Sequence, residues 1–330
     1  MEEDSLWSND GFLRVISATP TSPSMRGSVV VGGSGVGRSG ESVRNEHGKH
    51  KTPRKPEDLV SEKDRAIADL MRVRGVGEKM ANELYAKGVR SAKELADRDD
   101  VSTRVRLCAK YVDELYEEIP TDLVHAFAGW LETRLMLDGF QDGPAASVLD
   151  VILVGAHRRG MESAHDIDIL VVYDTGATKG KMLTTQLEKE FASHKAYIGT
   201  LELGETHYTF IWRMGKKARL VDLYVCPNDE KGSTLLHTTG PSNFNVLMRK
   251  RAKHMSMLLS QHGLYKKDQR IASLTEIDIF EALGLDYISV LSRGTEDALA
   301  MVVKTPYPPD AEIVEEIVEE SEMEEGGGKK

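Results

Sequence analysis

Apolar positions recur with two different periods along this chain, a helical period from residue 59 to about residue 140 and a strand period beyond it. In the first part the apolar residues stand three, four or seven positions apart, which places them on one face of a helix. The pattern stops at RVRGVG and resumes over residues 78–87, where Gly88 is expected to end a second helix. The first helix carries this apolar face: Leu59, Val60, Ala66, Ile67, Leu70 and Met71.

The turn between these two helices contains two glycines, Gly75 and Gly77, which flank Val76. Without side chains, they let backbone amides approach a DNA phosphate at the positive end of the second helix, and Lys79 adds charge there. The arrangement predicts a helix-hairpin-helix DNA-binding element. An ordinary helical hairpin with a glycine turn is the alternative interpretation.

The helical pattern continues after the hairpin, where Ser91 and Glu94 predict a capping box for the next helix. It runs through residues 105–120 and, after Pro120, through residues 121–140. The chain is therefore predicted to be an α+β protein, in which a helical subdomain precedes a mixed β-sheet. Strands are predicted in three apolar or alternating segments: residues 148–155, 166–174 and 218–227.

Both ends of the chain lack a periodic pattern. Residues 1–57 contain only Trp7 and Phe12 as aromatics and are expected to form a disordered arm. Within the arm, GGSGVGRS imitates a phosphate-binding loop, but no amphipathic helix follows it, which favours a linker. The basic residues 49–55 predict a nuclear import signal, with a solvated charge cluster as the alternative. Residues 305–330 are expected to be an acidic disordered tail, although EIVEEIVEE can also form a short amphipathic helix.

Composition narrows the class of protein. The net charge is −10 at pH 7, but the last 22 residues hold nine acids and two lysines. The other 308 residues therefore carry a net charge of only −3, which is compatible with local basic surfaces. No apolar run reaches about 18 residues, so we expect no membrane span, and the amino terminus lacks the layout of a secretory signal. Cys108 and Cys226 form no C-x-x-C pair, which argues against a disulfide framework or a cysteine zinc site and fits a reducing, intracellular compartment.

Two aspartates begin the strand predicted over residues 166–174. Asp166 and Asp168 project to the same side of that strand, about 6 to 7 Å apart. Carboxylates this close repel unless a divalent cation lies between them, and oxygen ligands favour Mg²⁺ or Mn²⁺. Asp222, in the strand predicted over residues 218–227, can complete a two-metal site for in-line phosphoryl transfer. Surface acids at a strand end are the alternative for a bare D-x-D pair.

The loop before these acids suits a triphosphate. Gly155 permits close backbone approach, and Arg159 offers a forked donor to phosphate oxygens. The densest basic run of the folded part lies later, at residues 248–254. Phosphate contacts are expected there, with a solvated helix face as the alternative.

Four ordered blocks resemble the signature segments of the family X DNA polymerases. The pattern G-x-x-R-R-G-x-E-S-x-x-D-x-D at residues 155–168 is similar to the palm signature of that family. Residues 238–252 resemble the segment that abuts the new base pair, residues 275–288 resemble the carboxyl-terminal block, and the hairpin precedes them in the right order. The resemblance covers residues 59–293 and implies a nucleotidyltransferase-fold palm followed by a small α/β carboxyl-terminal subdomain.

The resemblance implies a two-metal polymerase. Asp166 and Asp168 would bind two Mg²⁺ ions, for which Mn²⁺ can substitute, and Asp222 would join the catalytic ion and help to deprotonate the primer 3′-hydroxyl. The implied activity is template-directed addition of deoxynucleotides in short-gap DNA repair. The alternatives are a template-independent or ribonucleotide-tolerant terminal nucleotidyltransferase and a non-catalytic DNA-binding module, which the intact acids disfavour.

The resemblance also assigns binding residues. Asn245 and Arg249 would read minor-groove edges of the nucleotide and the template, and the backbone carbonyls of Met71, Val73 and Val76 would hold a monovalent cation, K⁺ or Na⁺, that bridges to a DNA phosphate. The nucleotide-binding set is Gly155, Ala156, Arg159, His165, His237, Thr238, Gly240 and Asn245. The DNA-binding set is Arg249, Lys250, Arg251, Gly75, Gly77 and Lys79.

Several positions depart from the family pattern. Ala156 replaces a phosphate-binding serine, and Glu118 replaces an arginine that reaches the triphosphate in some members, so weaker nucleotide binding is expected unless His165 compensates. Leu220 replaces an arginine that often orients the third aspartate.

The sugar side and the amino-terminal region depart from it as well. His237 and Thr238 replace a Tyr-Phe pair, which puts ribonucleotide exclusion in doubt. The family's amino-terminal lyase domain has no counterpart, so we expect polymerisation without lyase activity and gap binding without a strong 5′-phosphate preference.

These features predict an organisation and a set of partners. The partners are template-primer or gapped DNA and dNTP, with no membrane; the protein is expected to be a nuclear monomer that meets repair partners through its arm or tail. The predicted domains are a disordered arm (1–57), a helical DNA-binding subdomain (58–144), a catalytic palm (145–230), a nascent-base-pair-binding subdomain (231–304) and an acidic tail (305–330).

Overall fold

The computed structural model describes residues 61–136, 148–176, 179–309 and 311. The chain divides into two compact units, residues 1–113 and residues 114–330. The arm and most of the tail lie outside the described residues, as do Leu59 and Val60. Across the described ranges, no helix combines the length and the apolarity that a bilayer crossing requires.

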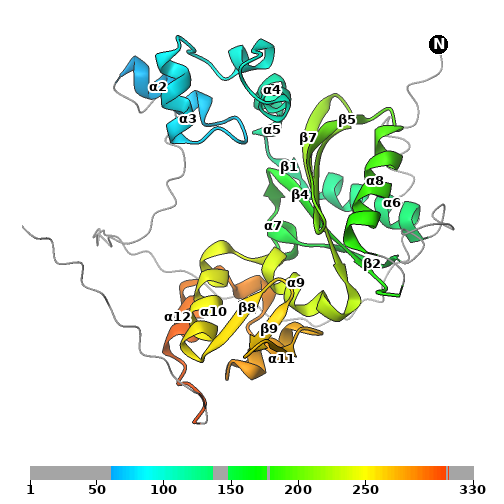
Figure 1. Cartoon of the computed structure of the whole chain (residues 1–330), viewed down its shortest axis with the longest axis vertical. Helices are drawn as coiled ribbons and strands as arrows, with labels where there is room; N and C mark the ends of the chain where they lie inside the picture. Colours follow the sequence, from blue (N-terminus) through cyan, green and yellow to red (C-terminus); the bar gives the residue numbers. More distant parts are fainter. Residues whose placement is uncertain (1–60, 137–147, 177–178, 310, 312–330) are drawn as a thin grey trace, which may run out of the picture. The chain divides into compact units, whose positions relative to one another are not determined.

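Short helices make up the described part of the first unit (Figure 1). Ser61 begins the first of them by accepting a hydrogen bond from the amide of Asp64. Gly75, with φ of 96°, turns the chain between the first two helices, and Gly88, with φ of 93°, follows the second, so the predicted order of a helix, a glycine turn and a second helix is confirmed. The elements are α2 (Glu62–Leu70), α3 (Glu78–Ala86), the 3-10 helix η2 (Lys93–Asp97), α4 (Thr103–Lys110) and α5 (Val112–Leu115), which crosses the division between the units.

Two predictions about helix boundaries are wrong. Ser91 donates its hydroxyl to the carboxylate of Glu94 instead of capping a helix, because the element that follows is only a 3-10 turn whose cap, Ala92, makes no side-chain bond. The helix predicted as far as Pro120 ends at Leu115. Its last two residues form the strand β1 (Ile119–Pro120), which pairs with β3 (Ser163–Ala164); the residue before a proline is biased toward extended backbone.

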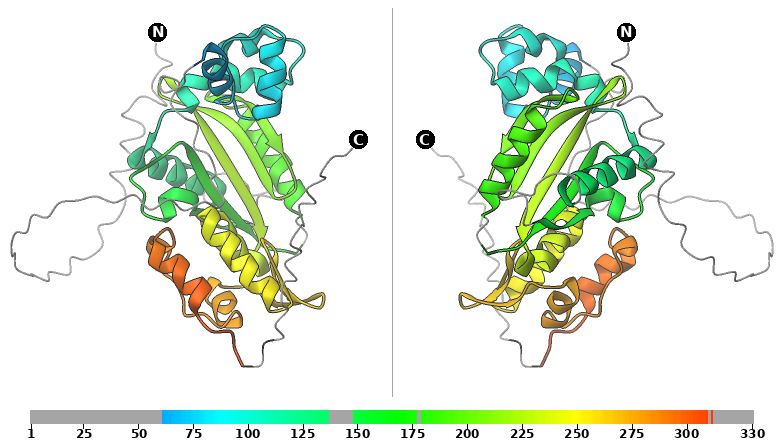
Figure 2. Two further views of the ribbon diagram at one scale, coloured as in Figure 1. Left: turned by 90° about the vertical axis from the view of Figure 1, so that its left-hand side faces the viewer. Right: turned by 90° about the vertical axis from the view of Figure 1, so that its right-hand side faces the viewer.

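A five-stranded mixed sheet lies at the centre of the second unit (Figures 1 and 2). Its strand order is β2-β4-β7-β6-β5, and β4 and β7 are its parallel neighbours, while the other neighbours are antiparallel. All three strands that the sequence predicted are present. The strands are β2 (Val148–Leu153), β4 (Asp166–Tyr173), β5 (Tyr197–Leu203), β6 (His207–Met214) and β7 (Lys217–Pro227).

Two helices, α6 (Thr121–Met136) and α8 (Gly180–Ala192), cover one face of this sheet. Trp212 of β6 packs between them, with its ring centroid 5.5 Å from that of Trp130 on α6 and 5.8 Å from that of Phe191 on α8. An aromatic core therefore fills this face of the sheet.

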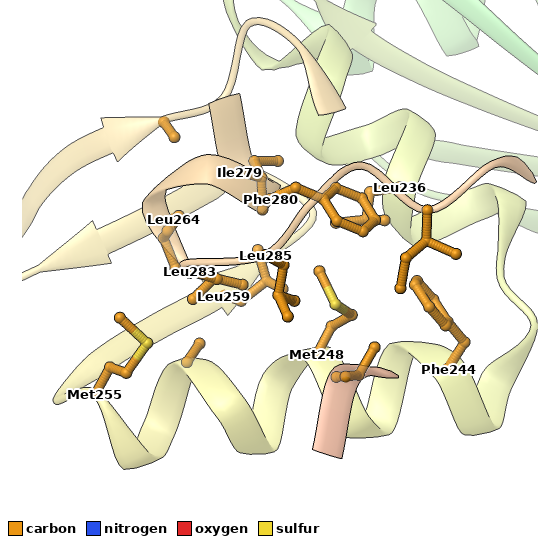
Figure 3. Close-up of a cluster of buried hydrophobic side chains, with 14 of the residues drawn as sticks. Leu236, Phe244, Met248, Met255, Leu259, Leu264, Ile279, Phe280, Leu283 and Leu285 are labelled. Atoms are coloured by element: carbon orange, nitrogen blue, oxygen red, sulfur yellow. The ribbon is translucent and has the colours of Figure 1, made fainter. Parts of the chain in front are cut away.

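Residues 228–309 form a layer of helices around a three-stranded antiparallel sheet, in the order β10-β9-β8, which we call the carboxyl-terminal part. Its core gathers side chains from α9, α10, α11 and this sheet, among them Leu236, Phe244, Met248 and Phe280 (Figure 3). Its elements are η4 (Asn228–Glu230), α9 (Lys231–Thr239), α10 (Ser242–His254), β8 (Met257–Ser260), β9 (Gly263–Lys266), β10 (Gln269–Ala272), α11 (Glu276–Ala282), η5 (Val290–Ser292) and α12 (Glu296–Lys304).

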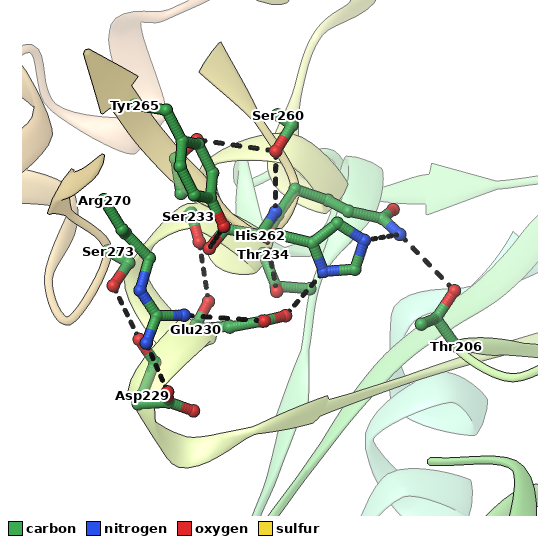
Figure 4. A network of polar contacts seen from close by, with 12 residues as sticks. Thr206, Asp229, Glu230, Ser233, Thr234, Ser260, His262, Tyr265, Arg270 and Ser273 are labelled. Carbon is green, nitrogen blue, oxygen red and sulfur yellow. Dashed lines mark hydrogen bonds and ion pairs between the residues drawn. The ribbon is translucent and has the colours of Figure 1, made fainter. Parts of the chain in front are cut away.

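A polar network fastens β10 and the β8–β9 turn to the segment that leaves β7 (Figure 4). Arg270 pairs with Asp229 and, at 3.5 Å, with Glu230. His262 donates from Nδ1 to the other oxygen of Glu230 at 2.6 Å, and Ser273 donates to the carbonyl of Asp229 at 2.7 Å. The carboxyl-terminal part is thus anchored beside the end of β7.

Candidate active site

Three carboxylates from two parallel strands converge on the face of the sheet opposite to α6 and α8. Asp168 on β4 and Asp222 on β7 are register partners, and Asp166 stands two residues earlier on β4, on the same face. One oxygen from each carboxylate lies within 4.8 Å of the others. Asp222 is 2% exposed, whereas the other two are partly buried. An oxygen-only donor set at this separation suits a divalent cation such as Mg²⁺ or Mn²⁺.

The short turn α7 (Gly155–Arg158) packs directly against one of these acids. Gly155 has φ of 61°, and a Cβ atom added to it would lie 2.0 Å from Oδ2 of Asp168. The amide of Val154 donates to the carbonyl of Asp168 at 3.0 Å. Both the backbone conformation and the available space therefore require glycine. The close neighbour that the structure shows is the Asp168 carboxylate, and an approach to a triphosphate remains a prediction.

Two arginines at the end of this turn reach the carboxyl-terminal part. Arg158 binds both carboxylate oxygens of Glu276, at 2.7 and 3.1 Å, and the hydroxyl of Thr239. Arg159 donates to the carbonyl of Thr239. Burial lowers the pKa of Arg159, and the charges of Asp168 and Asp166 oppose that shift. Arg159 therefore lies near the acids, and its expected contact with a triphosphate remains a prediction, whereas the role of Arg158 was missed.

The buried carboxylate of Glu276 compensates the positive charge of Arg158. It also accepts a hydrogen bond of 2.6 Å from Arg293, which is fully buried. Burial raises the pKa of Glu276, but the hydrogen bonds and charges of Arg158 and Arg293 outweigh it, so the pKa is lowered overall. In the sequence, residues 275–288 were identified only by their resemblance to a family segment. That resemblance did not predict that Glu276 is buried together with two arginines.

Two polar residues of β6, His207 and Thr209, contact Oδ1 of Asp222. Sequence reasoning missed both. They stand 15 and 13 residues before Asp222 in the chain, and only the pairing of β6 with β7 brings them to it. The one available signal was the alternation of His207, Thr209 and Ile211 with the buried aromatic residues of β6.

Residues expected on the nucleotide side form a cluster between α9 and α10. Asn245 donates to the carbonyl of His237, and Arg249 donates to Nδ1 of the same residue, both at 2.7 Å. Burial lowers the pKa of His237, and the positive charge of Arg249 adds to the effect. Thr238 donates to a carbonyl within α9. Gly240, with φ of 64°, comes close to Arg159, since its added Cβ would lie 3.5 Å from Nη1.

The remaining expected nucleotide ligands lie near β3. Ala156 is partly buried in α7. His165 is exposed, and its ring centroid is 5.8 Å from that of Tyr116. Glu118 accepts a hydrogen bond of 2.9 Å from Ser163, beside the β1–β3 pair. His165 therefore remains the exposed donor of this group.

The expected DNA contact of Arg251 is wrong. This side chain is 3% exposed, and its guanidinium donates to five backbone carbonyls that follow α11 and end α12. Burial lowers the pKa of Arg251. Arg249, Lys250 and Lys253 are exposed, because a helix turns consecutive residues to different sides. The five carbonyls belong to Leu283, Gly284, Val302, Thr305 and Pro306.

The hairpin of the first unit exposes the three residues expected to meet DNA, Gly75, Gly77 and Lys79. Of the three residues whose carbonyls were expected to hold a cation, Val73 and Val76 have buried side chains and Met71 is exposed. The carbonyl of Val73 accepts a hydrogen bond of 2.9 Å from the amide of Val76. A monovalent cation at this turn remains a prediction.

Comparisons with known proteins find similar proteins among the DNA polymerases and DNA nucleotidyltransferases. A family model described as the DNA polymerase beta thumb matches residues 234–293. DNA polymerase lambda of Rattus norvegicus is 23% identical over 257 residues, which cover 70% of this chain and 42% of that protein. DNA nucleotidylexotransferase of Xenopus laevis is 26% identical over 281 residues, which cover 72% of this chain and 54% of that protein. The chain thus spans about half the length of these relatives.

Solved structures of polymerase beta from Leishmania infantum share the fold. The ternary gap complex aligns with a TM-score of 0.64 at 22% identity and covers 72% of this chain and 92% of that chain. The ternary P/T complex aligns with a TM-score of 0.62 at 23% identity and covers 71% and 100%. The predicted α+β class, with helices preceding a mixed sheet, is confirmed. The thumb model and the curated relatives agree with each other, and together they support a family X DNA polymerase.

Proposed function

We propose that this protein is a template-directed DNA polymerase that adds deoxynucleotides to a primer 3′-hydroxyl during short-gap repair. The observation that carries the proposal is the convergence of Asp166, Asp168 and Asp222 within 4.8 Å. Two bound Mg²⁺ ions would stabilise the attacking and the leaving oxygens of an in-line displacement at the α-phosphate. The three carboxylates would hold these ions, and Asp222 would also accept the proton of the 3′-hydroxyl.

The triphosphate would lie between the acids and Arg159. The partly buried guanidinium of Arg159 faces the negative charges of Asp166 and Asp168, where a triphosphate bound to the ions would come into reach. To bind it, Arg159 must exchange its hydrogen bond to the carbonyl of Thr239 for a charge-assisted one, which is roughly twice as strong.

The DNA would be held by exposed basic residues. Arg249, Lys250 and Lys253 present one exposed side of α10, and Gly75, Gly77 and Lys79 are proposed to bind phosphates at the hairpin, with a monovalent cation there. The related polymerase from Leishmania was solved as a ternary gap complex and a ternary P/T complex, which supports gapped or primed DNA as the partner. We further propose that the protein acts as a nuclear monomer, divided into the domains predicted above.

A template-independent terminal transferase is the second candidate. It is favoured by the relatedness to DNA nucleotidylexotransferase and by the His237-Thr238 pair on the sugar side. The two functions differ in one property, the need for a complementary strand.

Primer extension decides between them. A labelled primer is offered single-stranded, annealed to a template and in a one-nucleotide gap, with each dNTP or rNTP and Mg²⁺ or Mn²⁺. Correct-base addition confined to the annealed and gapped substrates supports the polymerase; addition to the free primer supports the transferase. Asp168→Asn should abolish either activity, whereas Asp174→Asn, the same change at an exposed acid just beyond β4, should not. Failure of every substrate with both metals would refute both proposals.

A further inference from the structure

The third acid of the site is supported from a neighbouring strand. In the antiparallel pairing of β6 and β7, Thr209 lies opposite Asp222 and His207 lies opposite Tyr224. Side chains two residues apart share a face, so all four stand on the face of the sheet opposite to α6 and α8. Since Asp168 is the partner of Asp222 on its other side, one row across three strands contains Asp168, Asp222 and Thr209.

Two donors meet on a single oxygen of Asp222. Oδ1 accepts a hydrogen bond of 2.5 Å from the hydroxyl of Thr209 and lies 3.1 Å from Nε2 of His207. The same Nε2 is 3.1 Å from the hydroxyl oxygen of Thr209. An ionised carboxylate only accepts hydrogen bonds, so Nε2 must carry the hydrogen. Anchoring Oδ1 at two points fixes the rotation of the carboxylate about its Cβ–Cγ bond.

The ring of His207 is itself held in place. It stacks on the ring of Tyr224, with centroids 4.7 Å apart and planes inclined by 18°. A stacked ring cannot turn freely, so the direction of its N–H bond is set before any ligand binds. Thr209 is fully buried, which likewise restricts its hydroxyl. Leu220, which precedes Asp222 on this face of β7, is apolar and offers no donor.

We infer that His207 and Thr209 are positioning residues that orient the Asp222 carboxylate for the metal site from strand β6. This inference rests on the proposed function only for its consequence in catalysis; the orientation itself concerns metal binding. A partner that orients a ligating carboxylate typically contributes about 10- to 100-fold to metal affinity or activity. The loss should appear in kcat and in metal affinity, because neither residue is proposed to touch the nucleotide.

At His207 and at Thr209, two variants each distinguish the effect of losing the hydrogen-bond donor from the effect of changing the side-chain packing. His207→Phe keeps a ring on Tyr224 but removes the N–H donor, whereas His207→Gln removes the ring but keeps an N–H donor at similar reach. Thr209→Val removes the hydroxyl at constant shape, and Thr209→Ser retains it. Each is measured for thermal stability, for Mn²⁺ binding by calorimetry without nucleotide, and for kcat and KM for dNTP in gap filling.

The inference predicts that His207→Phe and Thr209→Val each lower Mn²⁺ affinity and kcat by about 10-fold or more, with KM for dNTP changed less than about threefold. His207→Gln and Thr209→Ser should stay within about threefold of the wild type. The opposite order, with His207→Phe active and His207→Gln impaired, would show that stacking matters and the donor does not.

Failure of this inference can be told apart from failure of the proposed function. Wild-type gap filling with unchanged Mn²⁺ affinity and kcat in both donor-removing variants overturns the inference and leaves the function standing. A wild type without any nucleotide incorporation overturns the function, and the calorimetric comparison then still decides whether His207 and Thr209 support a metal site.

Discussion

Gly155→Ala is the substitution that most directly tests the packing of the active site. A methyl group at this position would lie 2.0 Å from Oδ2, 2.7 Å from Cγ and 2.9 Å from Cβ of Asp168. Nonbonded heavy atoms pack at about 3.5 Å, so the side chain of Asp168 has to move by about 1 Å or more. Because Asp168 is the middle of the three proposed metal ligands, the substitution should act on catalysis and not only on folding.

Two separate costs follow from the geometry. The left-handed backbone at Gly155, with φ of 61°, makes any L-residue less stable there by about 1–2 kcal/mol. A displacement of about 1 Å in a reacting constellation costs about 100-fold in rate, which equals about 2.7 kcal/mol of transition-state stabilisation. We therefore expect a moderate loss of stability and a large loss of kcat.

Gly215→Ala is the matched control. Gly215, between β6 and β7, has nearly the same φ, 60°, but an added Cβ meets nothing within 4 Å. Both variants are compared by urea unfolding and by single-nucleotide gap filling at saturating dNTP. Gly215→Ala should lose about 1–2 kcal/mol of unfolding free energy and keep its kcat. If Gly155→Ala keeps a wild-type kcat, or if both variants lose the same activity, the proposed contact between the turn and Asp168 does not govern catalysis.

Three further outcomes are expected. Asp222→Ala should lower incorporation at least about 1,000-fold and leave DNA affinity nearly unchanged in a filter-binding assay; measurable extension would contradict its role. Arg251→Ala should lose about 3 kcal/mol of unfolding free energy. Lys250→Ala should keep its stability and weaken DNA binding in a salt-dependent way. A stable Arg251→Ala variant that binds DNA more weakly would instead show that Arg251 contacts DNA. Burial raises the pKa of Cys108 to about 11 and that of Cys226 to about 12, from an ordinary 9.0. Both thiols should therefore resist a thiol reagent at pH 8 until the protein is unfolded, and because the folded pKa values are the higher ones, stability should fall as pH rises above about 9.

The sequence identified features that depend on local chain order. The strand that begins at Asp166 and the glycine turn at Gly75 were predicted correctly, because hydrophobic periodicity and turn-forming residues are local features of the sequence. Asp222 was selected because a two-metal site needs a third acid and this residue stands in another alternating strand. These positions needed no knowledge of which strands pair.

Long-range pairing and helix orientation were not accessible in this way. His207 reaches Asp222 only through the register of β6 with β7, which no local pattern specifies. Arg251 belongs to a basic run, yet the rotation of α10 buries it under two other segments. Arg158 looks like its neighbour Arg159 in the sequence, and only the position of Glu276, 118 residues further on, distinguishes them.

Glu276 also gives the molecule a mechanical linkage. Its carboxylate is bonded to Arg158 at the end of α7 and to Arg293 beyond η5, and the first residue of α7, Gly155, abuts Asp168. Any movement of α11 relative to the central sheet would either break the ion pair between Arg158 and Glu276 or move the turn α7 with it. A displacement of α11 would in this way reach Asp168, one of the three proposed metal ligands.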